Sequence, residues 1–293
     1  MIPKKESQAF LLALAPGLFV LLWSTGFIGA KFGLPFAEPL TFLLIRFAFV
    51  IGLLGLLALL LRRPWPHRPI LWLHIAVAGS LLHGGYLSGV FLAIHHGMPA
   101  GVVALIVGIQ PLLTAFLGAS MVGERVVPRQ WLGLVLGFAG VTLVVWEKLG
   151  VAGLSAAGLA FSAMALFSIT LGTLYQKRFC ADLDLWSGSV IQFIAAALTL
   201  LPFALAFETM RVTWSGQFVF ALGWLIVVLS LGAISLLHLL IRRGAATRVS
   251  ALFYLTPPTT ALMAWLAFGE GMGWPAVAGM AIAALGVAIA VRR

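Results

Sequence analysis

The chain repeats part of its own sequence at a constant distance of 146 residues. Displacing the sequence by that distance places Pro111 on Pro257 and Glu124 on Glu270, and no gap is needed between these points. The residues of the first half that meet an identical residue include Pro111, Thr114, Ala115, Gly123, Glu124, Gly133, Gly140, Val141 and Val145. A duplication restricts the fold to two related units, and in an apolar chain it is typical of repeats that surround a central site.

The composition places these units in a lipid bilayer. Hydrophobic residues make up 62% of the chain and charged residues 9%, and the mean hydropathy is +1.12. So few charges cannot cover the surface of a soluble domain. The formal net charge of +10 does not indicate nucleic-acid binding, because the basic residues form short clusters between apolar runs. The single Cys180 excludes an internal disulfide, and no Cys/His spacing indicates a metal site, so we expect no cofactor.

Apolar runs of roughly 18 to 24 residues, enough to cross a hydrocarbon core of about 30 Å, recur along the chain. We predict ten membrane-spanning helices, at about 8–30, 38–61, 70–93, 99–121, 128–146, 153–176, 184–207, 216–239, 247–268 and 274–291. The first run lacks a small-residue cleavage site, so we expect it to be retained rather than removed as a signal peptide. Short polar loops with Pro and Gly separate the runs.

The basic residues predict the orientation of these helices. With the N-terminus in the cytoplasm, fourteen of the 18 lysines and arginines fall on the cytoplasmic side. Only Lys31, Lys148 and Arg211 fall outside, and Arg46 lies within a span. Cytoplasmic loops carry an excess of Lys and Arg. We therefore predict a multi-pass protein of a bacterial-type inner (plasma) membrane, with both termini in the cytoplasm.

The number of spans in each repeat predicts how the two copies lie in the membrane. Five crossings is an odd number, so the second unit enters upside down relative to the first. We predict an all-α fold of two inverted five-helix units, residues 1–146 and 147–293, around a central cavity. Inverted repeats can exchange their conformations, which produces the outward-open and inward-open states of alternating access.

Proline interrupts corresponding spans in the two halves. Pro111 lies midway along the fourth predicted span, and Pro257 and Pro258 lie at the matching place in the ninth. Each proline removes an amide donor and frees a carbonyl about one turn earlier. In lipid such a carbonyl needs a partner, so matching breaks indicate a cavity near the midplane, with Gln110 and Tyr254 beside it. The alternative is a pair of kinks that only improve helix packing.

Arg46 is the one cation well inside a predicted span, and the 146-residue offset places Gln192 opposite it. Eight residues separate it from Glu38, which puts it about 12 Å along the helix on the outer side of the midplane. A buried arginine is costly in lipid and should face the bundle interior. No acidic residue lies at comparable depth. The guanidinium can bind a substrate carboxylate or phosphate; alternatively, it braces freed backbone carbonyls or extends to the interface.

Further polar residues complete the predicted substrate site. His83 and Tyr86 are three residues apart and share a helix face. His83 is the membrane residue best suited to carry a proton, because histidine titrates near ~6.5. Trp23 and Ser24 interrupt the first span with an aromatic ring and a hydroxyl. These residues line a cavity or, alternatively, are buried groups satisfied by neighbouring helices.

Small residues recur in the fifth and tenth predicted spans. Gly133, Gly137 and Gly140 stand at spacings that allow close helix contact, as do Gly279 and Gly286. We predict packing seams there, either within the bundle or between protomers. The protein is accordingly expected to be a monomer or a homodimer.

Several short motifs follow one another in a fixed order. They are Leu22-Trp23-Ser24, Ile45-Arg46-Phe47, Ile109-Gln110-Pro111, Gly123-Glu124, Thr256-Pro257 and Gly269-Glu270. In this order they resemble the EamA family of the drug/metabolite transporter superfamily, over nearly the whole chain. The resemblance implies a ten-helix inverted-repeat fold that moves small metabolites, often amino acids, commonly outward. It also implies a structural role, capping or bridging at a span boundary, for Glu124 and Glu270.

The sequence therefore favours a secondary transporter, an exporter of a small amphipathic metabolite such as an amino acid. Arg46 would hold a carboxylate, the aromatic rings would pack the apolar part, and Gln110 and Gln192 would add hydrogen bonds. No phosphate-binding loop is present, so transport is expected to be either proton-coupled through His83 or downhill. The alternatives are a channel-like facilitative permease and a membrane-embedded enzyme, for which no nucleophile with a nearby base is recognisable.

Overall fold

The structure is an all-α bundle, seen in a computed structural model that describes residues 4–98, 100–149, 155–181, 183–243, 246–268 and 273–292. Within these ranges the one contact of β type is an isolated bridge between Ala37 and Val212. The helical segments of the first half are α1 (Lys4–Gly33), η1 (Leu34–Phe36), α2 (Pro39–Leu60), α3 (Pro69–Gly79), η2 (Ser80–Gly85), α4 (Tyr86–His95), α5 (Ala100–Val107), α6 (Gln110–Val122) and α7 (Pro128–Leu149). Those of the second half are α8 (Ala156–Phe179), α9 (Leu185–Phe207), α10 (Gly216–Trp224), η3 (Leu225–Ala233), α11 (Ile234–Arg243), α12 (Ala246–Ala251), η4 (Leu252–Leu255), α13 (Thr256–Phe268) and α14 (Trp274–Val291).

Nine helical stretches in the described part of the chain are long and apolar enough to cross a membrane. Large apolar side chains such as Leu198, Phe207 and Leu266 are exposed on the bundle, as a lipid-facing surface requires. The remaining predicted span, 247–268, is divided among α12, η4 and α13 and is not among the nine. The helical membrane fold is as predicted, whereas the count of ten crossings and the inverted arrangement stay predictions.

Both proline breaks expected from the sequence are present. α5 ends at Val107 and α6 begins at Gln110, so Pro111 lies in the first turn of α6, where its missing N–H is not needed. Pro257 and Pro258 lie in the first turn of α13, directly after the 3-10 turn η4. The chain therefore interrupts its helices at corresponding places in the two halves.

A second pair of irregular segments was not expected from the sequence. η2 and η3 are π-helical, and the 146-residue offset places Ser80 at the start of η2 on Ile226 in η3. Wider π turns change the direction of the side chains that follow and are frequent at functional sites. These two segments contribute side chains to the central cavity.

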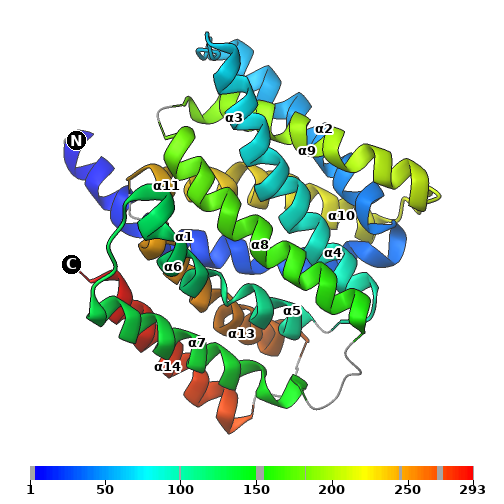
Figure 1. Cartoon of the computed structure of the whole chain (residues 1–293). Coiled ribbons are helices and arrows are strands. Elements are labelled where there is room, and N and C mark those ends of the chain that lie inside the picture. Colours follow the sequence, from blue (N-terminus) through cyan, green and yellow to red (C-terminus); the bar gives the residue numbers. More distant parts are fainter. Residues whose placement is uncertain are drawn as a thin grey trace.

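α7 and α14 lie side by side (Figure 1). A Cβ atom at Gly140 would collide with the backbone nitrogen of Ala283, and one at Gly286 with that of Gly137. Glycine is required at both places because the two helix backbones are in contact. The predicted packing seam is confirmed, and it joins the two halves within one chain.

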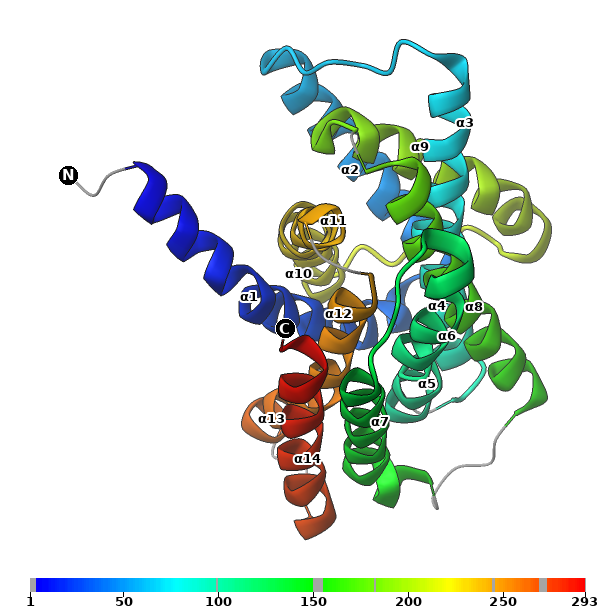
Figure 2. The same ribbon diagram turned by 60° about the vertical axis from the view of Figure 1, so that its left-hand side comes forward.

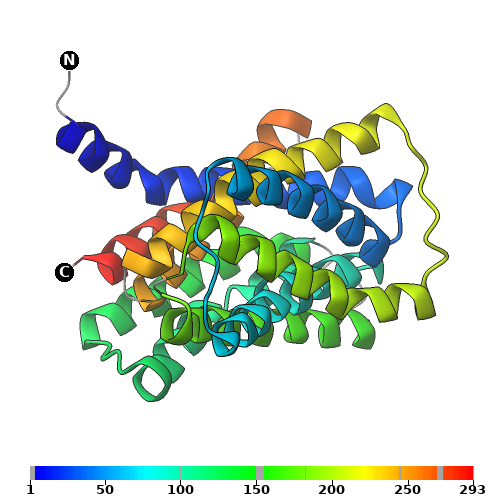
Figure 3. The ribbon, with the colours of Figure 1, turned by 90° about the horizontal axis from the view of Figure 1, so that it is seen from above.

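Carboxylates join α2 and α9, a second pair of helices that lie side by side (Figure 2). Glu208 accepts hydrogen bonds from the backbone N–H groups of Leu40 and Thr41, both at 2.7 Å, and so caps α2. Glu38 accepts in return from the backbone N–H of Thr209 at 2.8 Å. The α1–α2 and α9–α10 connections therefore meet at one end of the bundle, opposite the start of α1 and the end of α14 (Figure 3).

Glu124 has the capping role that the family resemblance implies. Its carboxylate accepts hydrogen bonds from the backbone N–H of Ala246 at 2.6 Å and of Thr247 at 3.2 Å, at the start of α12. The cap holds the first residues of a broken helix in the second half against a loop of the first half. The matching Glu270 lies outside the described residues.

Candidate functional site

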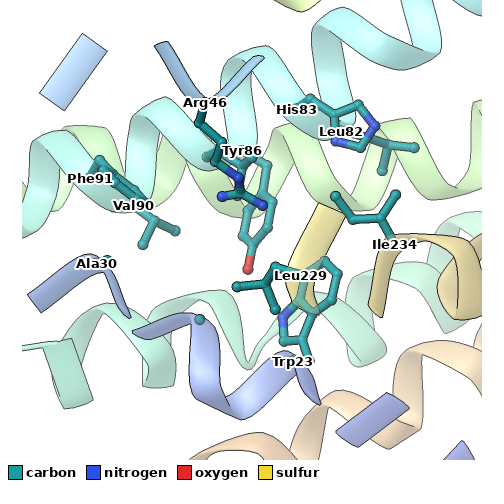
Figure 4. Close-up of a pocket in the computed structure, with 12 residues that line it drawn as sticks. Trp23, Ala30, Arg46, Leu82, His83, Tyr86, Val90, Phe91, Leu229 and Ile234 are labelled. Carbon is teal, nitrogen blue, oxygen red and sulfur yellow. The ribbon is translucent and has the colours of Figure 1, made fainter. Parts of the chain in front are cut away.

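Elements from both halves line a cavity of about 40 Å³ between the helices, which has room for water but not for a metabolite. Its lining comes from α1 (Trp23, Gly26, Ala30), α2 (Arg46), η2 (Leu82, His83), α4 (Tyr86, Leu87, Val90, Phe91), η3 (Leu229) and α11 (Ile234). Figure 4 shows the guanidinium of Arg46 beside the ring of Tyr86, whose hydroxyl is directed toward Trp23. Two aromatic rings and a cation thus face one space.

Arg46 is the charged group of this cavity. Its side chain is only 2% exposed, and its Nε donates a hydrogen bond to the hydroxyl of Ser230 at 3.1 Å. Ser230 in turn donates to the backbone carbonyl of Leu225 at 3.2 Å. None of the acidic side chains that the structure describes forms an ion pair with Arg46. A buried cation with a single neutral partner is costly, and an anion beside it would offset that cost.

The rings of Trp23 and Tyr86 form one wall of the cavity, and two further rings pack against Trp23 without lining it. Trp23 and Tyr86 stack with their centroids 6.1 Å apart. Phe253 meets the indole of Trp23 edge-on at 5.3 Å, and Phe19 packs against both rings at the same distance. Such a wall suits the apolar part of an amphipathic ligand whose charged part lies at the guanidinium.

His83 forms the side of the cavity that faces α9. Its ring stacks on Phe193 with the centroids 4.3 Å apart, and its Nε2 lies 3.3 Å from Oε1 of Gln192. Because Oε1 is an acceptor, the imidazole donates in this contact. Nε2 of Gln192 then donates to Oε1 of Gln176 at 2.9 Å. The histidine is therefore connected to polar groups outside the cavity.

Four of the eight predicted substrate-binding residues meet at this cavity. They are Trp23, Arg46, His83 and Tyr86. The predicted helix-break residues do not line it; these are Pro111, Pro257 and Pro258. The structure thus brings four of the predicted side chains together and leaves the proline breaks apart from them, and the binding role of the four stays a prediction.

The other four predicted binding residues are buried outside this cavity. Ser24 donates to a carbonyl of its own helix at 2.7 Å. Gln110 donates to the hydroxyl of Ser250 at 3.0 Å, and its Oε1 has no partner among the described residues. Tyr254 packs its ring against α7, and Gln192 lies behind His83. Their roles in binding stay predictions.

The sequence matches the EamA-like transporter family over residues 9–146 and 156–292. The chain belongs to this family. Similar proteins include the inner membrane transporter YedA of Escherichia coli, 26% identical over 287 residues, which are 95% of this chain and 89% of that protein. The "Probable amino-acid metabolite efflux pump" of Escherichia coli is 27% identical over 251 residues, 82% of this chain and 81% of the relative.

A solved crystal structure with 21% sequence identity has the same fold. It aligns with a TM-score of 0.76 over 95% of this chain and 96% of its own. The transporter YvbV of Bacillus subtilis is 28% identical over 267 residues, 86% of this chain and 81% of that protein. The protein is thus a multi-pass membrane transporter and not an enzyme.

Two buried polar residues next to the candidate site were not predicted from the sequence. Ser230 is the hydrogen-bond partner of Arg46. His238 on α11 lies with its ring centroid 6.2 Å from that of His83 and its Nδ1 3.4 Å from the hydroxyl of Ser189. Both lie in one long apolar run that also contains Ser235, so the available signal was a few polar residues within a predicted span.

The transporter also has a wider groove, of about 690 Å³, between α4, α8 and α9. It ends at Glu38 and Glu208, whose carboxylates already accept backbone hydrogen bonds. Its border includes Phe207, which is 80% exposed, so the groove opens on the lipid-facing surface. The central cavity, where a cation and other polar groups converge, is the better candidate for a metabolite site.

Proposed function

We propose that this transporter exports a small amphipathic metabolite with a carboxylate, such as an amino acid, across the inner membrane by alternating access. The observation that carries the proposal is Arg46, a buried cation beside an aromatic wall and without an acidic partner in the described part of the chain. A substrate carboxylate can form charge-assisted hydrogen bonds with its guanidinium. The name of the Escherichia coli efflux pump supports the same class of substrate.

The small central cavity supports alternating access. A volume of about 40 Å³ is too small for an amino acid, so the site must enlarge before a substrate binds. The segments η2 and η3, which line the cavity, are irregular at corresponding places in the two halves. We expect these segments to change conformation when the cavity opens to one side of the membrane.

Thermal unfolding of the purified transporter tests the proposed site. L-leucine, L-phenylalanine and L-threonine are each compared with their carboxamides, which keep the side chain and the amine but lack the carboxylate. A ligand that binds only the folded state raises the melting temperature. We expect an amino acid, and not its amide, to stabilise the wild type. Arg46→Gln should lose this stabilisation, while the exposed control Arg243→Gln should keep it. Equal stabilisation by amide and acid would contradict carboxylate binding.

Counterflow in proteoliposomes then tests the mechanism with the stabilising amino acid. Alternating access predicts saturable uptake of the labelled substrate that is accelerated by unlabelled substrate on the other side. Uptake that does not saturate would instead support a channel-like permease. A pH gradient imposed on the same vesicles shows whether transport is proton-coupled through His83 or downhill. His74→Gln is the control for His83→Gln, because His74 lies outside the cavity, 2.8 Å from the hydroxyl of Tyr175.

A further inference from the structure

A line of buried polar side chains leads away from the central cavity between α8, α9 and α11. It begins at His83 and continues through Gln192 to Gln176, with contacts of 3.3 and 2.9 Å. Beside these residues, the hydroxyl of Ser189 lies 3.4 Å from Nδ1 of His238. All five side chains are buried in an otherwise apolar bundle. We call these five residues the polar track.

The polar track borders a second cavity, of about 20 Å³, which is large enough for water. The residues that line it include Gln176, Ser189, Gln192 and His238 of the track, with Cys180, Asp184 and Arg242. Arg242 is exposed, so this cavity lies where the bundle meets solvent. The track therefore connects the Arg46 cavity with an end of the bundle that water reaches.

Two buried polar atoms, one on a residue that lines this cavity and one a helical turn away from such a residue, lack a hydrogen-bond partner among the described residues. They are Nε2 of His238 and Oγ1 of Thr173, one turn before Gln176 on α8. Their side chains are only 4% and 1% exposed. An unpaired buried polar atom is costly, and bound water in a polar cavity is the usual way to satisfy it. The unpaired atoms therefore point to hydration of this region.

The charges along the polar track favour an anion. Arg46 stands at one end and Arg242 at the other. Among the described residues that line the second cavity, the one acidic residue is Asp184, which caps α9 and lies 3.9 Å from Arg63. The amide, hydroxyl and imidazole groups between the ends carry no negative charge. A path lined in this way attracts a carboxylate and repels a cation.

We infer that the polar track is the cytoplasmic access path by which a carboxylate-bearing substrate reaches Arg46, and that Arg242 selects for negative charge at its mouth. In the present conformation the hydrogen bond from Gln192 to Gln176 and the contact between Ser189 and His238 close the path. Opening breaks these contacts and widens the space between α9 and its neighbours α8 and α11. The inference rests on the proposed function because it takes the Arg46 cavity as the destination, and it takes the cytoplasmic side from the predicted orientation of the helices.

The chain contains its own reporter for this opening. Cys180 is its single cysteine, lines the second cavity and is 6% exposed. Burial raises the pKa of its thiol to about 11, so it reacts slowly until the path opens to solvent. Leu82→Cys, combined with Cys180→Ala, places a second reporter in the central cavity. Membrane-impermeant methanethiosulfonates applied to inside-out vesicles then measure access from the cytoplasmic side without any substrate.

The first comparison breaks the closing contact. Gln192→Met keeps the length of the side chain and removes both of its hydrogen bonds. Thr199→Val is the matched control, because it removes a hydrogen bond of the same helix, to Ser80 at 2.9 Å, outside the track. We expect Gln192→Met to raise the modification rate at both reporters about fivefold, the factor that one neutral hydrogen bond represents. Equal modification rates in Gln192→Met and Thr199→Val would contradict the proposed access path. A faster rate at Cys180 without a faster rate at the Leu82→Cys thiol would contradict it as well.

The second comparison tests charge selection and leaves the closing contacts intact. At the Leu82→Cys thiol, the rates of a sulfonate and a trimethylammonium reagent are each divided by that reagent's rate with a free thiol in solution, and the ratio of the two should favour the sulfonate. Arg242→Gln should lower this ratio about threefold, whereas Arg243→Gln, whose side chain does not line the cavity, should not change it. A normalised ratio that favours the cationic reagent, or equal effects of the two variants on this ratio, would overturn the role of Arg242. Since no substrate is present, these results are independent of amino-acid binding at Arg46.

Discussion

α2 and α9 are corresponding helices of the two halves, and they present different polar groups from the same position. On α2, Arg46 places a cation in the central cavity with Ser230 as its hydrogen-bond partner. On α9, Gln192 is a neutral amide that bonds to His83 and to Gln176. The guanidinium of Arg46 has further N–H groups that can bind a ligand. The amide of Gln192 already donates and accepts hydrogen bonds within the protein.

This difference indicates different roles for Arg46 and Gln192, which occupy corresponding positions in the two halves. An arginine in both places would bury two cations in one region of low dielectric, at a cost that neither neutral partner could offset. A glutamine can exchange its neutral hydrogen bonds for water at a modest cost. On the proposed mechanism, α2 therefore binds the substrate and α9 closes the path that leads to it.

The largest effect is expected from giving α9 the residue of α2. Gln192→Arg buries a second cation beside His83, with no acidic partner among the described residues. We expect the free energy of unfolding to fall by about 3–5 kcal/mol, measured as a lower melting temperature in detergent. Gln192→Met is the control, since it removes the same hydrogen bonds without adding charge. Equal melting temperatures for Gln192→Arg and Gln192→Met would show that α9 tolerates a buried cation at this position. That result would contradict the proposed difference between α2 and α9.

A smaller effect is expected from giving α2 the residue of α9. Arg46→Gln should weaken binding of a stabilising amino acid by about 1.5–3 kcal/mol, the value of a hydrogen bond to a charged group. The unliganded variant should be no less stable than the wild type, because the change removes a buried cation. Titration calorimetry and thermal unfolding measure the two quantities. A clear loss of stability without ligand would show that Arg46 braces the helices instead.

The smallest effect is expected at Ser230, the residue that holds Arg46 in place. Ser230→Ala removes the hydrogen bond to Nε and should weaken amino-acid binding by about 0.5–1.5 kcal/mol. Ser88→Ala is the matched control, because this buried hydroxyl bonds only to carbonyls within its own helical stretch, at 2.6 Å for the shorter contact. The same titration distinguishes them. An equal loss in both variants would mean that Ser230 does not position the guanidinium.

Much of the fold and half of the candidate site could be predicted because lipid imposes simple rules on sequence. Apolar runs long enough to cross a bilayer indicate helices, and a proline within a run indicates a break. Arg46 and His83 stand out because polar groups in such runs are costly. Ser230 and His238 follow the same rule but look ordinary in sequence, because only their contacts distinguish them from other buried polar residues.

The sequence by itself determined that this chain is a duplicated helical membrane protein with a cation inside the bilayer. The tertiary structure alone decided which polar residues share a cavity. Gln110 and Tyr254 stand beside the proline breaks, yet they face other helices and not Arg46. The physical reason is that the rotation of each helix depends on backbone contacts with its neighbours, such as Gly140 against α14, and on the wider turns of η2 and η3. Hydropathy does not encode these rotations.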